Sequence, residues 1–307
     1  MRRLTVHLVY HDRYDLNFGE HVFPAQKYRL VRERLLAEGV AAAVDFVAPE
    51  PATDEDMRLV HEAEWIGRLR AGTLSYLERM RLEIPWSPAV RDGFWHGTGG
   101  TILAARLALA HHVGFNIGGG FHHAFPAHGE GFCAVNDIAV AIRRLQHDGA
   151  IARAMVVDCD VHHGNGTAAI FAGDDSVFTL SIHQYNNYPG EKPPSSVDIH
   201  LDDGTGDAEY LERLEAALIP AMAEFDPHLL IYVAGADPYG FDRLGGLALT
   251  ISGLMRRDRF VLDSALARGA AAAVVLAGGY AADTNETVAI HVNTVRAAQQ
   301  ALTRAAG

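Results

Sequence analysis

The chain has 307 residues, of which 49% are hydrophobic, and its 26 basic and 38 acidic side chains give a formal net charge of −12. A chain of this size and composition can bury a large core, so we expect one large domain or at most two. The acidic balance argues against nucleic-acid binding, which requires a basic face. No apolar stretch is long enough to span a bilayer.

The two cysteines and the start of the chain bear on the compartment. Cys133 and Cys159 lie in apolar surroundings without the paired spacing of a disulfide framework or a structural zinc site. The first residues include two arginines, but His7, His11 and Asp12 interrupt any apolar signal region. We therefore expect a cytoplasmic protein with no membrane partner.

Apolar runs typical of strands alternate with helical patterns along the chain. The expected strands are Leu4–Tyr10, Val40–Val47, the run leading into Asn116-Ile117, Val177–Ile182, and the runs ending at Asp158, Asp237 and Tyr280. The expected helices are Ala25–Glu38, Met57–Arg70 (preceded by a Thr53/Asp56 cap), Gly93–His112, Asp137–Gln146, Asp207–Glu224, Ser252–Ala267 and Glu286–Arg304. This alternation predicts an α/β fold with a mostly parallel central sheet and helices on both faces.

The most informative segment runs from Asp158 to His162, after an apolar stretch and before Gly164-Asn165-Gly166. Successive side chains of an extended strand alternate faces, so Asp158, Asp160 and His162 would project from the same side. Ionised carboxylates are costly to bury unless they are paired or hold a metal. The segment therefore indicates a functional site, although an Asp/His cap on a strand-to-helix turn is the simpler alternative.

Three further apolar runs lead into polar groups. One opens into three glycines followed by His122-His123, the second ends at Asp237, and the third ends at Gly278-Gly279-Tyr280. Parallel sheets place functional groups at the carboxyl ends of their strands. We therefore expect these groups to meet the Asp158 segment at one edge of the sheet.

Together these residues suggest a metal site with proton-transfer groups beside it. Asp160, His162 and Asp237 provide oxygen and nitrogen ligands and leave a position open, as in catalytic zinc sites. Zinc would polarise an acyl carbonyl and lower the pKa of its bound water to about 7. His122-His123 could then move protons, and Tyr280 could donate to an oxyanion. Taken alone, the histidine pair could lack a role and Tyr280 could serve only in packing.

At this point the sequence resembles the zinc-dependent histone deacetylase family of the arginase/deacetylase superfamily. The matching motifs are GGGFHH (118–123), GEGFCAVND (129–137), VVDCDVHHGNGT (156–167), LSIH (180–183), GADP (235–238), DRLGGLALT (242–250) and GGY (278–280). Three details look most like the class IV branch: GNG after the D-x-H unit, TGGTILAA (98–105) and EHVFPAQKY (20–28). The resemblance implies the arginase/deacetylase fold and a bacterial-type single catalytic domain over residues 1–307.

The resemblance implies a role for each matching residue of the catalytic group. The zinc ligands would be Asp160, His162 and Asp237, with one zinc ion per chain. His122-His123 would be the paired histidines, the second being the general base and acid, and Tyr280 would polarise the acyl carbonyl.

Other matching positions would orient the catalytic groups, form the tunnel or bind a second ion. Asp158 would orient His122 and fix its tautomer. The acyl-lysine tunnel would be formed by Gly131, Phe132 and Leu244. A monovalent cation, usually potassium, would be held by Asp158, Asp160, His162, Ser181 and Ile182.

The chain departs from the family pattern at two places. Asn165 stands where many members have an acid paired with the second histidine. Asparagine can still orient His123 but brings no charge, so we expect His123 to have a lower pKa than in acid-paired relatives. The stretch Ile84–Ser87 lacks the rim acid that grips a substrate backbone in many relatives, which leaves peptide recognition open. Arginases need an acid where Gly164 stands, so we expect one metal and not two.

Three functions remain open. The favoured one is hydrolytic removal of acyl groups from N-ε-acyl-lysine in a peptide or protein, or from a related acylated amine. The second is the same chemistry on a small molecule, such as an acetylpolyamine or a long-chain acyl conjugate. The third is a non-catalytic module that binds acylated ligands. The loop 184–194, rich in proline and tyrosine, is either a wall of the substrate entrance or an ordinary surface loop.

Overall fold

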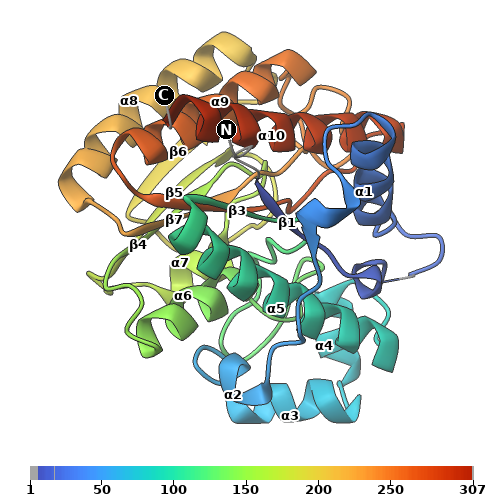
Figure 1. Cartoon of the computed structure of the whole chain (residues 1–307). Coiled ribbons are helices and arrows are strands. Elements are labelled where there is room, and N and C mark those ends of the chain that lie inside the picture. The colour runs from blue at the N-terminus through green and yellow to red at the C-terminus, as the bar shows by residue number, and fades with distance from the viewer. Residues whose placement is uncertain (1–5, 17, 306–307) are drawn as a thin grey trace.

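The computed structural model describes residues 6–16 and 18–305. In this part of the chain eight strands form one sheet in the order β2-β1-β3-β8-β7-β4-β5-β6 (Figure 1). Every strand pair is parallel, with register partners such as Asp158 and Ser181. The strands are β1 His7–Val9, β2 Phe46–Val47, β3 Val113–Asn116, β4 Ala154–Asp158, β5 Val177–Gln184, β6 Val197–Leu201, β7 Leu229–Val233 and β8 Ala271–Val275.

Helices cover both faces of the sheet. Helices α1, α8, α9 and α10 lie on one face, and α2 to α6 lie on the other (Figure 1). The helices are α1 Lys27–Ala37, α2 Asp54–Met57, α3 Ala63–Ala71, α4 Tyr76–Leu82, α5 Pro88–His111, α6 Asp137–His147, α7 Asn165–Ile170, α8 Asp207–Phe225, α9 Ile251–Ala267 and α10 Thr284–Ala305. Because both faces are covered, β3, β4, β7 and β8 are buried along their whole length. The expected α/β fold is confirmed, and the described sheet is parallel throughout.

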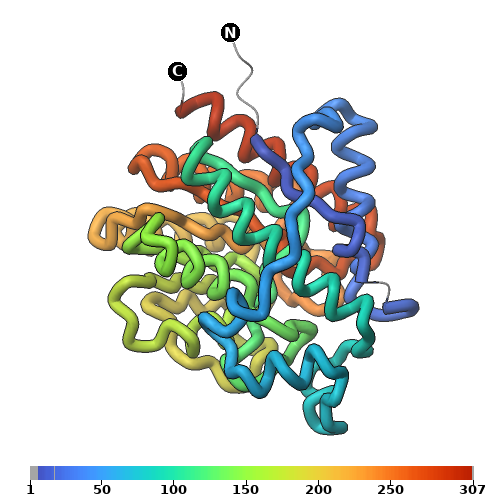
Figure 2. Tube along the Cα trace, turned by 60° about the horizontal axis from the view of Figure 1, so that its bottom comes forward, coloured from blue at the N-terminus to red at the C-terminus, as the bar shows by residue number. Residues whose placement is uncertain are grey.

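A glycine in α5 allows an extended segment to cross that helix closely. The chain between β2 and α2 runs over α5 (Figure 2), and the Ala52 amide donates to the Trp95 carbonyl at 2.9 Å. A Cβ at Gly99 would collide with the backbone carbonyl of Glu50. Gly99 therefore has a packing function.

Two predicted elements are wrong. A single strand over Val40–Val47 is replaced by a 3₁₀ turn at Ala43–Asp45 and the two-residue β2, because the Asp45 carboxylate accepts from the Ala42 amide. A single helix over Met57–Arg70 is replaced by α2 and α3. The Thr53/Asp56 capping box exists, but it begins α2.

The break between α2 and α3 has a tertiary cause. The Glu62 amide donates to the Pro126 carbonyl at 2.9 Å, so the chain leaves the helical path to meet the 125–126 loop. Helices α4 and α7 and strand β6 were not predicted. Of the predicted first strand, the structure shows His7–Val9, and Leu4 and Thr5 lie outside the described residues.

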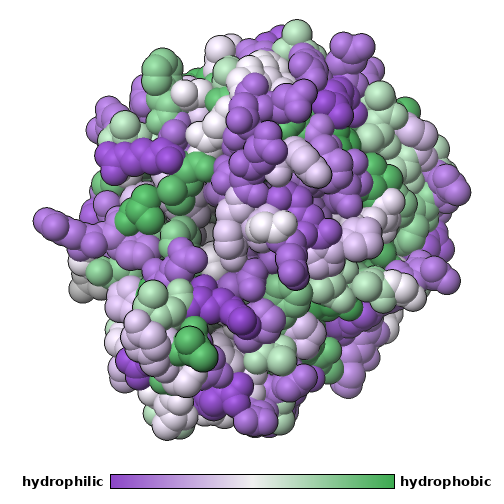
Figure 3. All heavy atoms as spheres, turned by 180° about the vertical axis from the view of Figure 1, so that it is seen from behind, coloured by the Kyte–Doolittle hydropathy of each residue, from purple (hydrophilic) through white to green (hydrophobic). Residues whose placement is uncertain are grey.

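No helix among the described residues combines the length and apolar character needed to cross a membrane. The face of the molecule shown in Figure 3 is mostly hydrophilic, with small separate hydrophobic patches.

We expect the buried His61 to reduce stability as the pH falls. Its Nδ1 donates to the Phe125 carbonyl at 3.0 Å, and its Nε2 accepts from the Asn136 amide at 2.9 Å. Burial lowers the pKa of His61 from 6.5 to about 4. Between these values the unfolded chain binds a proton that the folded chain does not, so the free energy of unfolding should fall by about 2 kcal/mol between pH 7 and pH 5.

Denaturant unfolding of the wild type and His61→Gln at both pH values checks this. The variant should lose less stability than the wild type on acidification, and equal losses would show that another group is responsible.

Candidate active site

The four central strands bring the candidate residues to one edge of the sheet. His122 and His123 follow β3, Asp160 and His162 follow β4, Asp237 follows β7, and Tyr280 follows β8. These strands are neighbours in the order β3-β8-β7-β4. A cavity of about 170 Å³ is lined by Glu83, His123, Gly131, Phe132, His162, Asn187, Tyr188, Leu244 and Tyr280.

Asp160, His162 and Asp237 form a tight buried group. His162 Nδ1 lies 2.9 Å from Asp160 Oδ1 and 3.4 Å from Asp237 Oδ2. The relative exposures of the three residues are 1%, 7% and 0%. The expectation that one extended strand projects Asp158, Asp160 and His162 is wrong, because β4 ends at Asp158. In the turn that follows, the Val161 amide donates to Asp237 Oδ1 at 2.8 Å and the His162 amide donates to Asp160 Oδ1 at 2.9 Å.

The group has the properties of a cation site. Asp237 Oδ2 is buried and accepts no hydrogen bond from the described residues. Burial and the nearby Asp160 raise the pKa of the Asp237 carboxyl to about 7. Burial lowers the pKa of His162, but Asp160 and Asp237 outweigh it and raise that pKa to about 10. A Cβ at Gly278 would collide with the Asp237 carboxylate. The backbone can therefore approach the two acids this closely only because residue 278 is glycine. Two carboxylates and an imidazole with a free position fit a catalytic zinc ion.

In a second group of possible ligands, His163, His183 and Asp198, every possible ligand atom except His163 Nδ1 has a hydrogen-bond partner among the described residues. His163 Nε2 lies 3.1 Å from Asp198 Oδ1, and the Ser195 amide donates to the other carboxylate oxygen at 2.9 Å. His183 has a partner at each ring nitrogen. This group therefore lacks the crowded, unpartnered carboxylate of the first.

The two adjacent histidines have different environments. His122 Nδ1 donates to Asp158 Oδ2 at 2.7 Å. Burial lowers the pKa of His122, but Asp158 and Asp160 outweigh it and raise that pKa to about 9. His123 Nδ1 lies 2.7 Å from Asn165 Oδ1. Burial, His122 and His162 hold the pKa of His123 well below its usual value, and the Asn165 hydrogen bond offsets this only in part. At neutral pH His122 is therefore charged and His123 is neutral.

The walls of the cavity include the loop 184–194 as well as the predicted tunnel residues. Asn187 and Tyr188 come from this loop, which is therefore part of the entrance. Gly131 has φ +51°, and a Cβ there would lie 2.8 Å from Tyr188 and 2.9 Å from His123. The close approach of these two side chains depends on that glycine.

The carboxylate of Glu83 lies at the cavity, although the sequence did not predict an acid there. Residues Ile84–Ser87 contain no acid, but Glu83 immediately before them lines the cavity. Burial and the neighbouring Glu130 raise the pKa of the Glu83 carboxyl. Glu83 ends α4 in a left-handed conformation. The Ser75/Glu78 capping box was the available signal for that helix.

A buried lysine beside Tyr280 was also missed. Lys27 Nζ donates to the Ala277 carbonyl at 2.6 Å and lies 5.7 Å from the centre of the Tyr280 ring. Burial lowers the pKa of Lys27 to about 8, against the opposing pull of Asp237 and Asp160. Lys27 lies in the EHVFPAQKY segment (20–28), and the sequence alone predicts no role for this lysine.

Comparison with known proteins gives consistent matches. The family model of the histone deacetylase domain matches residues 21–295. An uncharacterized protein of Picosynechococcus sp. is 41% identical over 293 residues, 95% of this chain and 98% of that protein. Histone deacetylase 2 of Arabidopsis thaliana is 30% identical over 92% of this chain and 77% of its own length. The crystal structure of the HDA15 HD domain shares the fold, with a TM-score of 0.82 and 23% identity over 98% of this chain and 93% of that one.

We expect protein purified without added metal to contain about one transition-metal ion per chain, held by Asp160, His162 and Asp237. Asp237→Ala should lose the metal, because the remaining ligands are one carboxylate and one imidazole. Elemental analysis of both proteins measures this.

The control is Asp198→Ala, which removes the carboxylate of the second group and should leave the metal content unchanged. Two equivalents in the wild type, or full occupancy in Asp237→Ala, would contradict the assignment.

Proposed function

The chain belongs to the histone deacetylase family, and we propose that it is a zinc-dependent hydrolase that removes acyl groups from N-ε-acyl-lysine or a related acylated amine. The observation that supports this most directly is the unpartnered buried carboxylate oxygen of Asp237. That oxygen belongs to an Asp-His-Asp group whose neighbouring residues, His123 and Tyr280, line the same cavity. A binding module without catalysis would not need this combination.

The residues of the site can divide the reaction among them. Bound zinc would polarise the acyl carbonyl and lower the pKa of a water molecule to about 7. Neutral His123 accepts the proton of the attacking water through Nε2 while the water oxygen bonds to the acyl carbon. The Tyr280 hydroxyl donates to the carbonyl oxygen as it becomes negative. The carbon–nitrogen bond then breaks, the amine takes the proton back from His123, and the acyl group leaves as a carboxylic acid. His122, whose Nδ1 donates to Asp158, has a raised pKa and would contribute positive charge to the site.

We further propose an inner potassium site next to the zinc site. Asp158 and Ser181 are register partners on β4 and β5, and Ile182 follows on β5. Asp158 and Ser181, together with the backbone carbonyl groups of Asp160, His162 and Ile182, would supply oxygen ligands, which hard cations prefer. We also propose a single catalytic domain, membership of the class IV branch on the motifs given above, and a cytoplasmic location.

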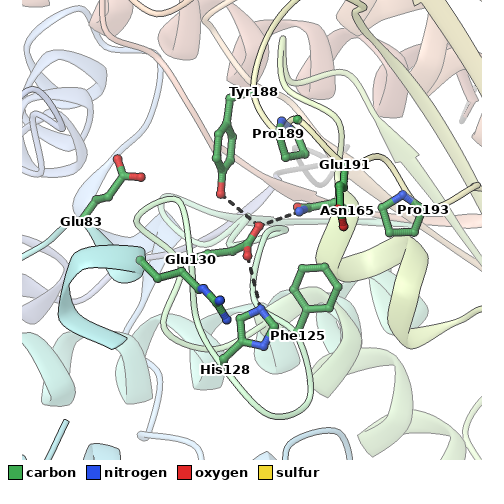
Figure 4. A pocket seen from close by; sticks show the side chains of 11 residues that line it. Glu83, Phe125, His128, Glu130, Asn165, Tyr188, Pro189, Glu191 and Pro193 are labelled. Carbon is green, nitrogen blue, oxygen red and sulfur yellow. Dashed lines mark hydrogen bonds and ion pairs between the residues drawn. The ribbon is translucent and has the colours of Figure 1, made fainter. Parts of the chain in front are cut away.

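The cavity of the candidate site lies beside a second, larger pocket. Gly131, Phe132 and Leu244 line the cavity of about 170 Å³. Beside its mouth lies a wider pocket of about 450 Å³, which shares Glu83 and Tyr188 with the cavity (Figure 4).

The wider pocket supports a small-molecule substrate as the second candidate. It is lined by three glutamates, Glu83, Glu130 and Glu191, and one arginine, Arg81. An acyl-lysine with a basic neighbour, or an acylated diamine, would place the positive charge of its unacylated basic group beside these acids.

We expect Tyr280→Phe to lose most turnover while keeping its metal and its fold. The hydroxyl would act mainly in the transition state, and loss of such a donor typically reduces kcat by about 10²–10³-fold. Turnover of an acyl-aminocoumarin lysine substrate, with metal content measured on the same sample, checks this. Near wild-type turnover would mean that Tyr280 only packs against Phe132.

Glu83→Gln should weaken binding of acylated amines that also carry a free ammonium group. An exposed charge contact of this kind is worth less than about 1 kcal/mol, so KM should rise about 2- to 5-fold with kcat unchanged. A neutral N-acyl alkylamine is the matched control and should show no change. The same rise for both substrates would show that Glu83 acts on shape and not on charge.

A further inference from the structure

We propose that Glu130 is a positioning residue that fixes the orientation of the Asn165 amide and thereby keeps the proton of His123 on Nδ1. This inference rests on the proposed function only in its use of His123 as the base. Glu130 lies in the GEGFCAVND motif, and nothing in the sequence assigned it a role.

A continuous line of hydrogen bonds connects the three residues. Asn165 Nδ2 donates to Glu130 Oε1 at 2.7 Å, and Asn165 Oδ1 lies 2.7 Å from His123 Nδ1 (Figure 4 shows the first contact). Asn165 and His123 are buried, with relative exposures of 2% and 5%. Water therefore has little access to the contact between Asn165 and His123, whereas the Glu130 end of the line faces the wider pocket.

The chemistry of the three side chains determines which atoms donate and which accept in these hydrogen bonds. An ionised carboxylate only accepts hydrogen bonds, so the amide NH₂ of Asn165 must face Glu130. The amide oxygen then faces His123, and because that oxygen also only accepts, Nδ1 must carry the proton. His123 Nε2 is left with a free lone pair, as a general base requires.

Without the carboxylate, the amide has no fixed orientation. A half-turn of the Asn165 side-chain amide would present NH₂ to His123 and favour the proton on Nε2. In that tautomer the nitrogen that must accept a proton is already occupied. An acid at position 165 would keep the proton on His123 Nδ1 without help from Glu130, because a carboxylate accepts with both oxygens.

Glu130 itself is firmly held. The Tyr188 hydroxyl donates to Oε1 at 3.0 Å, and His128 Nε2 lies 3.3 Å from Oε2. Burial raises the pKa of the Glu130 carboxyl, but the contacts with His128, Asn165 and Tyr188 outweigh it and hold that pKa below its usual range. The backbone of Glu130 is paired with Cys133 through two hydrogen bonds. The carboxylate is therefore ionised and fixed in place at neutral pH.

The test is Glu130→Met, which removes the acceptor and keeps a side chain of similar length. We expect kcat to fall by about 10- to 100-fold with KM little changed, the range typical for residues that orient a functional histidine. Nitrogen-15 NMR of the His123 ring should show protonation spreading from Nδ1 to Nε2. The matched control is Glu212→Met, an exposed acid of α8 that lines neither pocket, which should keep wild-type kcat and the Nδ1 tautomer.

A rescue variant separates positioning from general structural damage. Asn165→Asp added to Glu130→Met gives His123 a carboxylate partner directly, so most of the lost kcat should return. Asn165→Asp alone should be impaired, because its new oxygen would face Glu130 Oε1 across the 2.7 Å contact. A double variant no better than Glu130→Met, or a Glu130→Met protein with wild-type kcat and tautomer, would overturn the proposal.

The role of Glu130 can be tested even if the proposed function is wrong or the first variant does not fold. If the wild type turns over no acylated amine, the proposed function is wrong, and the NMR tautomer of Glu130→Met still decides the role of Glu130. If Glu130→Met does not fold, Glu130→Gln takes its place. Its own amide can turn, so a smaller change in the same direction is expected and an unchanged tautomer overturns the proposal.

Discussion

The rest of the structure depends on the burial of Asp160 and Asp237 beside each other. Two carboxylates removed from water repel one another and lose their hydration, so the surroundings must provide compensation. Amide groups of the turn after β4 donate to both side chains, and the Gly278 amide donates to Asp160 Oδ2 at 2.9 Å. One oxygen of Asp237 accepts no hydrogen bond within the part of the chain that the structure describes, and it marks the place where a cation fits.

Two buried cationic side chains, Arg257 and Lys27, hold the loops around these acids by donating to backbone carbonyl groups. Arg257 of α9, with no exposed surface, donates to the carbonyl groups of Cys159 and Gly235 at 3.1 and 2.8 Å. Lys27 of α1 donates to the Ala277 carbonyl. Each carbonyl lies close in sequence to a residue of the candidate site. The outer helices therefore contribute to the geometry of the site as well as to the core.

The two adjacent histidines of the candidate site are placed differently relative to a negative charge. His122 contacts the Asp158 carboxylate directly, and its pKa is raised as a result. His123 is separated from the Glu130 carboxylate by the neutral amide of Asn165. The oriented amide fixes which nitrogen of His123 donates without bringing a full charge to the ring. The pKa of His123 therefore stays low, although that of the adjacent His122 is raised. Tyr188 contacts Glu130 and also stacks edge-on to His123, so the entrance loop and this line of contacts are connected.

The sequence by itself determined the strands that end at the site and the identity of the groups they deliver. Apolar runs before Asp158, Asp237 and Tyr280 predict strands locally, and a parallel sheet requires their ends to share an edge. The break between α2 and α3, the place of Glu83 and the link from Asn165 to Glu130 could not be read in the same way. Each depends on contacts between segments distant in sequence, such as Glu62 with Pro126 and Asn165 with Glu130. Local propensity carries no information about which distant partner a side chain meets, and only the tertiary structure decides it.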